Sequence, residues 1–332
     1  MKFSVIICTY QRPKAIITLL NSVKVQLVYP TEILIIDGST NNQTNEILKN
    51  NSFKNLSYYK VKDLDRGLTK QRNYGISKVS KEIKVVCFLD DDTILSPSYF
   101  KNLIHTYNSK RDAVGVGGYI SNEVQWEKIN NRTCNSNYFC FDDYQRKEGT
   151  RFKLRKWLGL IDDTDPGFMP IYSHGRSISY LPPSNKIYEV EFFMGGVSSF
   201  KKDLLDKIKF STYFEGYGLY EDMDFCLRAS KIGQLYVNTA AKLEHYHEQS
   251  GRPNKYTYGK MVVRNGWHVW RVKYPNPTLK ARFKWNLTVV VLLKLRFLNI
   301  FTTQQRKEAF TEGIGRLVGW FSLFLNKPKR NI

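Results

Sequence analysis

The first hundred residues alternate between short, almost wholly apolar runs and amphipathic segments, and this order constrains the fold more than any other feature of the chain. The runs FSVIICTY, TEILIIDGST, LSYYKVK and EIKVVCFLDDD predict strands, and the first, second and fourth of them predict buried ones. Segments with helical spacing separate them and begin near Pro13, Gln43 and Gly67. Strand, helix, strand, helix predicts an α/β fold with a mostly parallel, Rossmann-like sheet and right-handed crossovers.

Polar residues stand where three of these strands end. Thr9, Tyr10 and Arg12 follow the first strand, Asp37 ends the second, and a run of three aspartates ends the fourth. Ligands of open parallel sheets bind outside the carboxyl ends of the strands. We therefore expect these three groups to open onto one edge of the sheet.

The run Asp90, Asp91 and Asp92 has two interpretations. The simpler one is a strand that ends in a solvated turn, because adjacent carboxylates repel one another. The other is a site for a divalent cation such as Mg²⁺ or Mn²⁺, which takes oxygen ligands from one or two carboxylates together with substrate phosphates. The run by itself does not decide between them.

The rest of the chain has a weaker pattern. Residues 119–190 mix aromatic and charged residues with Pro and Gly, and they predict a substrate-facing loop or lid with a helix near 151–160. The run VGVGGYI, residues 114–120, reads as a strand. After residue 187 the pattern predicts a strand, a Gly pair, a short strand and a helix, then a second helix and a strand that ends in a His-rich turn.

Six segments follow one another along the chain: SVIICTYQRP, ILIIDGST, GLTKQRNYGI, CFLDDDTIL, MGGVSSFKKDLL and EDMDFCLR. In this order they resemble glycosyltransferase family 2, the inverting nucleotide-sugar transferases of the GT-A fold, which include rhamnosyltransferases and related enzymes. The resemblance covers about residues 3–250. It implies transfer of a hexosyl or deoxyhexosyl group from a nucleoside-diphosphate sugar to a hydroxyl of a glycan or lipid-linked acceptor by direct displacement.

The resemblance also implies a metal site and a base. Asp90 and Asp92 would hold Mn²⁺ or Mg²⁺, and His245 would complete the metal shell, with His247 as the rival ligand because His-Tyr-His leaves the alignment open. The cation would neutralise the leaving diphosphate. Asp222 would be the general base that activates the acceptor hydroxyl, ahead of its neighbour Glu221.

The same resemblance implies a donor pocket and an acceptor side. Gly195 and Gly196 would let the backbone approach the acceptor, although a close-packed turn of the sheet explains the pair equally well. Gln71 departs from the usual Ala of the family and is expected to alter donor contacts. The residues implied for the nucleotide sugar are Thr9, Tyr10, Arg12, Asp37, Arg72, Asn73, Asp90 and Asp91.

The chain is strongly basic, with 51 Lys and Arg against 30 Asp and Glu. This balance predicts a polyanionic partner: nucleic acid, an anionic membrane or a phosphorylated substrate. The tail is basic, aromatic and helical, and its uninterrupted apolar run, 288–293, is far shorter than the roughly 20 residues of a spanning helix. The tail suits a helix lying on an anionic membrane surface, or equally a basic helix packed on the domain.

We expect a GT-A catalytic domain over 1–255, with a nucleotide-binding half (1–118) and an acceptor half (119–255), and a helical C-terminal extension over 256–332. The first apolar run is too short for a signal peptide, and the five cysteines include no CxxC pair, although Cys134 and Cys140 could meet in a loop. A cytoplasmic protein is the simpler interpretation, held peripherally on the cytoplasmic face of a membrane.

Three other function classes fit the sequence less well. An inactive nucleotide-sugar or carbohydrate-binding protein of the same fold would not need its acidic groups intact. A nucleic-acid binder is suggested only by the charge of +21, and the sequence has no recognition motif for it. A related nucleotidyltransferase would need a glycine-rich activation loop at the first strand, which is missing. We therefore expect no nucleic-acid partner.

Overall fold

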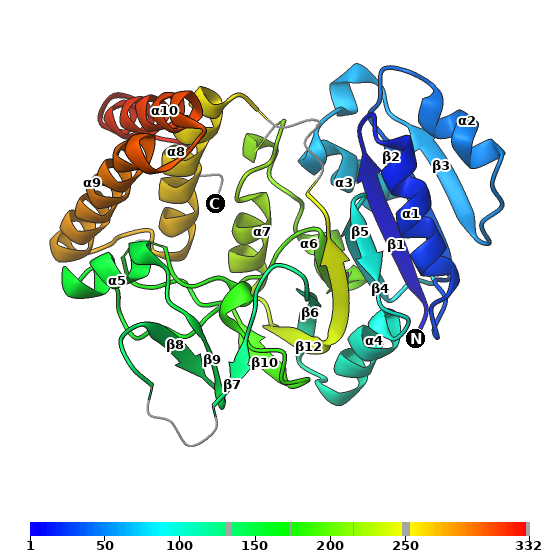
Figure 1. Cartoon of the computed structure of the whole chain (residues 1–332). Coiled ribbons are helices and arrows are strands. Elements are labelled where there is room, and N and C mark those ends of the chain that lie inside the picture. Colours follow the sequence, from blue (N-terminus) through cyan, green and yellow to red (C-terminus); the bar gives the residue numbers. More distant parts are fainter. Residues whose placement is uncertain (130–133, 173, 215, 248–252, 330–332) are drawn as a thin grey trace. The chain divides into compact units, whose positions relative to one another are not determined.

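The computed structural model describes residues 1–129, 134–172, 174–214, 216–247 and 253–329. The chain forms two compact units (Figure 1). Residues 1–125 and 177–251 make up the first unit, and residues 126–176 and 252–332 make up the second. The sequence predicted a catalytic domain up to residue 255 and a helical extension after it. This functional division of the chain stays a prediction.

A nine-stranded sheet forms the centre of the first unit, with the strand order β10-β12-β6-β11-β4-β1-β2-β3 and β5 paired with β12. The first four strands are mutually parallel, as predicted. β1, β2 and β4 are apolar along most of their length because they are buried on both faces, whereas β3, at the edge of the sheet, is only partly buried. The strands are β1 (Phe3–Thr9), β2 (Glu32–Asp37), β3 (Leu56–Lys60), β4 (Val85–Asp90), β5 (Thr93–Leu95), β6 (Ala113–Ile120), β10 (Ile187–Val190), β11 (Val197–Lys201) and β12 (Gln234–His245).

Helices connect these strands and cover the sheet (Figure 1). In α1 the side chains of Ile16, Leu19, Leu20 and Val23 are fully buried, which is the apolar stripe expected of a helix packed on a sheet. The helices predicted near residues 13, 43 and 67 are all present. The α-helices are α1 (Pro13–Lys24), α2 (Gln43–Lys49), α3 (Leu68–Lys78), α4 (Tyr99–Ser109), α6 (Lys202–Lys207) and α7 (Glu221–Ala229), and the 3₁₀ helices are η1 (Asp63–Asp65), η2 (Ile178–Tyr180) and η3 (Thr212–Phe214).

The direction of each strand decides which residues meet at the edge of this sheet. β11 is antiparallel to both β4 and β6, so β6 runs in the same direction as β4. β12 is parallel to β6 along its length. The carboxyl ends of β1, β2, β4, β6 and β12 therefore lie at one edge, together with the amino end of β11.

Residues 126–176 contain more regular structure than their sequence predicted. They form a three-stranded sheet, β7 (Glu127–Lys128), β9 (Tyr144–Lys147) and β8 (Tyr138–Phe141), followed by α5 (Thr150–Trp157). The helix predicted near 151–160 is confirmed. The strands were missed because they are only two to four residues long, which is too short for a periodic pattern to show.

Cys134 and Cys140 are joined by a disulfide in this segment, whereas Cys8, Cys87 and Cys226 are free thiols. Disulfides persist mainly in oxidising compartments. The pairing that the sequence left open is therefore present, and it stands against the expectation of a fully reduced chain.

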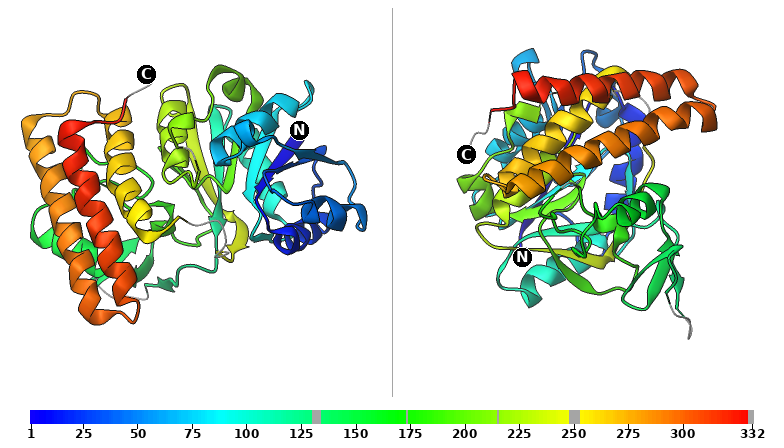
Figure 2. Two further views of the ribbon diagram at one scale, coloured as in Figure 1. Left: turned by 90° about the horizontal axis from the view of Figure 1, so that it is seen from above. Right: turned by 90° about the vertical axis from the view of Figure 1, so that its left-hand side faces the viewer.

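Three helices complete the second unit: α8 (Lys255–Lys273), α9 (Leu279–Thr302) and α10 (Arg306–Leu325). Figure 2 shows them side by side, coloured yellow to red. Trp270 of α8 stacks on Trp285 of α9, with ring centroids 5.7 Å apart. A Cβ atom on Gly315 of α10 would lie 2.1 Å from the carbonyl oxygen of Tyr256, so glycine permits the close approach of α10 to α8.

α9 is longer than its uninterrupted apolar run. Within the described residues it is long and apolar enough to cross a membrane by length and composition. The prediction from the sequence counted only the run 288–293, whereas the helix continues on both sides of it over 24 residues. That α9 does not span a membrane stays a prediction.

Candidate active site

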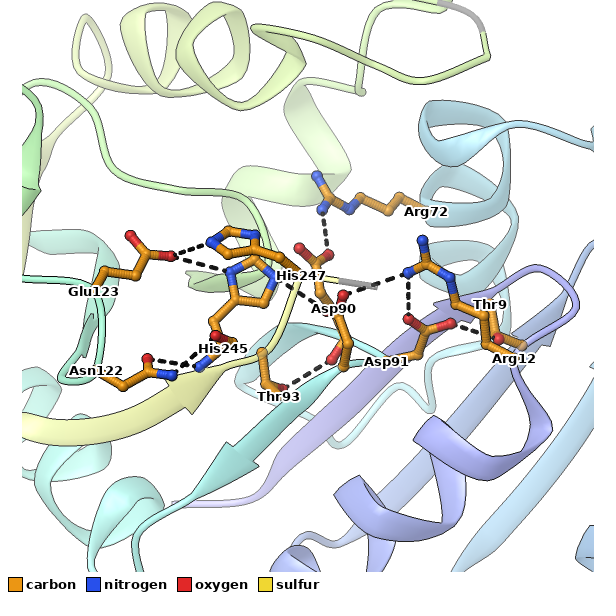
Figure 3. A network of polar contacts seen from close by, with 11 residues as sticks. Thr9, Arg12, Arg72, Asp90, Asp91, Thr93, Asn122, Glu123, His245 and His247 are labelled. Carbon is orange, nitrogen blue, oxygen red and sulfur yellow. Dashed lines mark hydrogen bonds and ion pairs between the residues drawn. The ribbon is translucent and has the colours of Figure 1, made fainter. Parts of the chain in front are cut away.

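The predicted cluster of polar residues at one edge of the sheet is present (Figure 3). Thr9 at the end of β1 pairs in register with Asp37 at the end of β2. Asp90 at the end of β4 lies beside Cys8 of β1. The strand ends therefore bring residues from positions 9 to 90 to the same place, as the parallel topology predicted.

Two of the three aspartates point toward a histidine. The Nε2 atom of His245, at the end of β12, lies 3.0 Å from Oδ1 of Asp92. One ligand atom each from Asp90, Asp92 and His245 lies within 4.8 Å of the others, which is close enough to surround one metal ion. These are the three ligands that the family resemblance implied, and carboxylate oxygen with imidazole nitrogen suits Mn²⁺ or Mg²⁺.

The middle aspartate points away from this group. Asp91 accepts hydrogen bonds from the Thr9 hydroxyl at 2.7 Å and from the Arg12 guanidinium at 2.9 Å. Burial raises the pKa of Asp91 to about 6, against the opposing effect of Arg12 and Thr9. Asp91 thus ties the loop after β1 to the end of β4, and the donor contact expected of it stays a prediction.

Glu123 is a further member of the site that the sequence analysis missed. Its Oε1 atom lies 2.8 Å from Nε2 of His247 and 3.4 Å from Nδ1 of His245. The Asn122 side chain donates to the carbonyl of His245 and accepts from its backbone N–H, both at 3.0 Å. Glu123 follows the carboxyl end of β6 by three residues, so the strand-end rule applied to residues 114–120 could have found it.

The two histidines have different partners. The ligand atom of His247 lies within 4.8 Å of those of Glu123 and His245. His245 lies equally close to the ligand atoms of Asp90 and Asp92. Burial lowers the pKa of His245, but hydrogen bonds to Asp92 and Glu123 outweigh it and raise this pKa to about 10. Of the two rivals, His245 is the one whose ring reaches the aspartates.

A buried ion pair stands on the other side of Asp90. Arg72 of α3 is paired with Glu221 at the start of α7, and its guanidinium also lies 3.7 Å from Oδ1 of Asp90. Burial raises the pKa of Glu221 to about 8, with Arg72 opposing the shift. Arg72 thus sits between the acidic run and the Glu-Asp pair of α7.

Asp222, the predicted base, is held by backbone groups. Its carboxylate accepts hydrogen bonds from the backbone N–H of Gly195 at 3.0 Å and from that of Met223 at 2.7 Å. Burial raises its pKa, although these two hydrogen bonds act in the opposite direction. Glu221 is committed to Arg72, so the two neighbouring carboxylates have different surroundings.

The glycine pair packs directly against these groups. A Cβ atom on Gly196 would lie 2.0 Å from a carboxylate oxygen of Asp90, and one on Gly195 would lie 2.6 Å from both Arg72 and Glu221. Any side chain here would displace the charged groups. The structure therefore gives a packing reason for the pair, and its contact with an acceptor stays a prediction.

The other residues implied for the donor have differing environments. Asp37 is fully buried and accepts from the Ser39 backbone N–H and the Tyr58 hydroxyl, while Tyr10 is exposed. Asn73 uses both ends of its amide on the backbone of Phe210. Asn73 therefore anchors a neighbouring loop, and a direct contact with donor stays a prediction.

Gln71, the departure from the family pattern, has a structural role. Its buried amide donates to the carbonyls of Ile36 at 2.8 Å and Thr9 at 3.2 Å, and accepts from the backbone N–H of Gly67 at 3.3 Å. The side chain thus joins the carboxyl ends of β1 and β2 to the start of α3. Its effect on donor contacts would be indirect, through the position of these loops.

Comparison with known proteins identifies the family. Residues 4–174 match the model of glycosyl transferase family 2. A glucosyl-dolichyl phosphate glucuronosyltransferase of Haloferax volcanii is 28% identical over 122 residues, 36% of this chain and 38% of that protein. The O-antigen chain rhamnosyltransferase RfbN of Salmonella typhimurium is 31% identical over 120 residues, 35% of this chain and 37% of that protein. The chain thus matches little more than a third of the length of either relative.

Solved structures agree in fold. A crystal structure of S. aureus TarS superposes with a TM-score of 0.50 at 18% identity, covering 88% of this chain and 43% of that one. GalNAc-T7, crystallised with UDP, GalNAc and Mn²⁺, superposes with a TM-score of 0.52 at 14% identity, covering 83% and 50%. These similarities identify the first unit's architecture as the predicted GT-A fold. With the family match extending over half of its residues, the chain belongs to glycosyl transferase family 2.

Proposed function

We propose that this chain is a metal-dependent, inverting glycosyltransferase that moves a sugar from a nucleoside-diphosphate sugar to a hydroxyl of a glycan or lipid-linked acceptor. The observation that carries the proposal is the convergence of Asp90, Asp92 and His245 at the sheet edge. Membership of the family supports it, as do the names of the two relatives, which are a glucuronosyltransferase and a rhamnosyltransferase.

The donor atoms at this edge fit a divalent cation. Two carboxylates and one imidazole within 4.8 Å of one another make a ligand set suited to Mn²⁺ or Mg²⁺. Such a cation, when bound, would supply the positive charge that stabilises a leaving diphosphate. Arg72 would add to that charge, because its fork of N–H groups matches phosphate oxygens. The nucleotide itself would lie against Thr9, Tyr10, Arg12 and Asp37.

The acceptor hydroxyl is a poor nucleophile and needs a base within hydrogen-bond reach. We assign this role to Asp222, because Glu221 is engaged by Arg72 while the Asp222 carboxylate accepts hydrogen bonds from the backbone N–H groups of Gly195 and Met223. Hydrogen bonds to backbone N–H groups favour the ionised, basic form. A single base with direct displacement inverts the anomeric carbon, so no carboxylate nucleophile is required.

The location follows from the proposed acceptor. A lipid-linked acceptor would be met at a membrane surface, and we propose a peripheral position on its cytoplasmic face. The Cys134–Cys140 disulfide tests this placement. Free thiols are blocked in intact cells before lysis, and mass spectrometry then measures how far Cys134 and Cys140 are modified. Modification of both would indicate a protein of the cytoplasm. An unmodified, disulfide-bonded pair would instead indicate that the second unit resides in an oxidising compartment.

The function is tested by screening nucleotide sugars, UDP-sugars first, for release of nucleoside diphosphate with and without Mn²⁺ or Mg²⁺. Asp222→Asn should lower kcat by about 10²- to 10⁴-fold while donor binding measured by calorimetry survives. Asp203→Asn, at an exposed position on α6, is the matched control and should be fully active. Normal turnover by Asp222→Asn would remove the base assignment. Donor binding without turnover on any acceptor would instead favour the inactive binding protein.

A further inference from the structure

One side of α9 is apolar and exposed at Phe283, Leu298 and Phe301, and half-buried at Leu287 and Val290. Phe283, Leu287, Val290, Leu298 and Phe301 recur at helical spacing, and Phe283 and Phe301 are 68% and 80% exposed. The opposite side of the helix carries the buried residues, including Trp285. An amphipathic helix normally turns its apolar side to the core and its polar side to water. α9 has apolar residues on both sides.

α10 repeats this arrangement. Phe310, Ile314, Leu317, Phe321 and Phe324 follow one another every three or four residues. The three phenylalanines are all more than half exposed. Gly315 of α10 packs closely against Tyr256 of α8. The apolar row lies on the opposite side of α10 and therefore faces away from α8.

The two rows lie on the same side of the helix pair. Asn286 accepts from the Trp320 indole at 2.8 Å, and Phe297 contacts Phe310 with ring centroids 6.2 Å apart, so the helices run antiparallel side by side. The contact residues Asn286, Phe297 and Trp320 each stand one position before a residue of an apolar row. In two antiparallel right-handed helices, the residues that follow the contact residues by one position point to the same side of the helix pair. We call this surface the hairpin face; its residues are Phe283, Leu287, Val290, Leu298, Phe301, Phe310, Ile314, Leu317, Phe321 and Phe324.

The charge around the hairpin face is almost wholly positive. Residues 253–329 contain fifteen Lys and Arg and two acids, Glu308 and Glu312. Both acids have basic partners: Glu308 is paired with Lys255, and Glu312 with Arg296 and Arg316. Lys294 lies within the apolar row of α9 and is exposed. Exposed basic side chains stand at the starts of α9 and α10 and directly after α10, namely Lys280, Arg306, Lys307, Lys327 and Lys329.

We propose that the hairpin face docks on a lipid bilayer containing anionic lipids, with α9 and α10 lying in the plane of the interface. Large contiguous apolar surfaces on a folded protein mark docking sites, and phenylalanine and leucine flanked by Lys and Arg match the boundary between acyl chains and anionic headgroups. Only 28% of the most apolar window of α9 is buried, so the helix is not a core helix of this unit.

The helices lie on the bilayer because α9 also holds polar contacts within the second unit. The ammonium of Lys284 donates to the carbonyl of Gly159 at 2.8 Å, and Arg296 is paired with Glu312. A spanning α9 would place both charged groups in hydrocarbon and break these contacts. The inference is independent of the proposed sugar transfer, because its test measures binding and requires no turnover.

The test is co-sedimentation of the full chain with vesicles of phosphatidylcholine alone and of phosphatidylcholine mixed with phosphatidylglycerol. We expect binding to the anionic vesicles that weakens with salt. The triple variant Phe283→Gln, Phe301→Gln, Phe321→Gln should bind at least about tenfold more weakly, because it removes apolar surface that would enter the bilayer. Lys280→Gln, Lys294→Gln, Lys307→Gln should lose the preference for anionic lipid.

A matched control replaces three exposed apolar residues of the first unit, Leu27→Gln, Leu64→Gln, Ile232→Gln, and should bind as the unchanged chain does. Circular dichroism and thermal melting verify that every variant is folded. Unchanged vesicle binding by the phenylalanine variant would overturn the proposal. So would a dimer that forms through these phenylalanines without any vesicle binding, and so would membrane retention that resists both high salt and alkaline carbonate, which is the behaviour of a spanning helix.

Discussion

Arg72 of α3 and Glu221 of α7, 149 positions apart in the sequence, form an ion pair in which the two side chains are only 3% and 4% exposed. The same guanidinium lies 3.7 Å from Asp90 and above the rings of Phe88 and Phe210. This one side chain therefore connects the acidic end of β4 to the helix that carries the proposed base. Like the contact between His245 and Asp92, the pair joins residues from the first hundred positions of the chain to residues beyond position 200.

Replacing Arg72 should destabilise the fold. Arg72→Met would leave Glu221 buried without its partner, and above about pH 8, where Glu221 is ionised in the folded chain, breaking a buried pair in this way costs about 3–5 kcal/mol. Chemical denaturation of the variant measures the loss. Arg111→Met, at an exposed position, is the control and should change the free energy of unfolding by less than about 0.5 kcal/mol. A loss as small as that for Arg72→Met would mean that the pair contributes no net stability.

The pH dependence of stability should report Glu221. Its pKa is about 8 in the folded chain against an ordinary value of 4.5, so between these values the folded state binds a proton that the unfolded state has released. The free energy of unfolding should therefore fall as the pH rises through this window, by up to about 1.4 kcal/mol per pH unit from this group.

Glu221→Gln is the variant that isolates this effect, because the amide does not titrate. Denaturation between about pH 5 and about pH 8 should give a flatter profile for the variant than for the unchanged chain. Parallel profiles would show that Glu221 is ionised throughout the range. Asp206→Asn, an exposed position of α6, should leave the slope unaltered.

Glu123 should tune metal affinity without being one of the three closest ligands. It lies 3.4 Å from the Nδ1 atom of His245, whose Nε2 atom faces Asp92. Carboxylates placed behind a ligating histidine fix its ring and raise its basicity, and their loss typically weakens metal binding about 10- to 100-fold.

Titration of Mn²⁺ into the Glu123→Gln variant, followed by calorimetry or by the electron paramagnetic resonance signal of free Mn²⁺, measures this effect. Glu127→Gln, four residues further on, should bind as the unchanged chain does. Equal affinity in the two variants would exclude Glu123 from the site, and complete loss of binding would make it a direct ligand.

Gln71 should matter for stability through the loops that it joins. Gln71→Ala removes two hydrogen bonds to strand carbonyls in a buried position and leaves Ile36 and Thr9 without this donor. The Thr9 carbonyl keeps the Gly38 backbone N–H as a donor, so the expected cost is that of the lost hydrogen bonds, about 0.5–1.5 kcal/mol each. Thermal and chemical denaturation should show this loss, whereas the exposed Gln43→Ala should be near neutral. A stable Gln71→Ala variant would mean that the loops hold their positions without the amide.

Much of the first unit follows from local pattern. The strands β1, β2, β3 and β4 and the helices between them are where the sequence predicts them, because buried parallel strands require continuous apolar runs and packed helices require apolar stripes. The strands of residues 126–176 did not follow, since strands as short as β7 leave no periodic signal.

By itself, then, the sequence determined the alternation of strands and helices, and with it the edge at which Thr9, Asp37 and Asp90 meet. Only the tertiary structure decided that Glu123 joins His245, that Arg72 reaches Glu221, and that α9 and α10 turn their apolar rows the same way. Those relationships depend on the direction of β6 and β12 in the sheet and on how helices pack. Such contacts join residues far apart in the chain, so no local window of sequence encodes them.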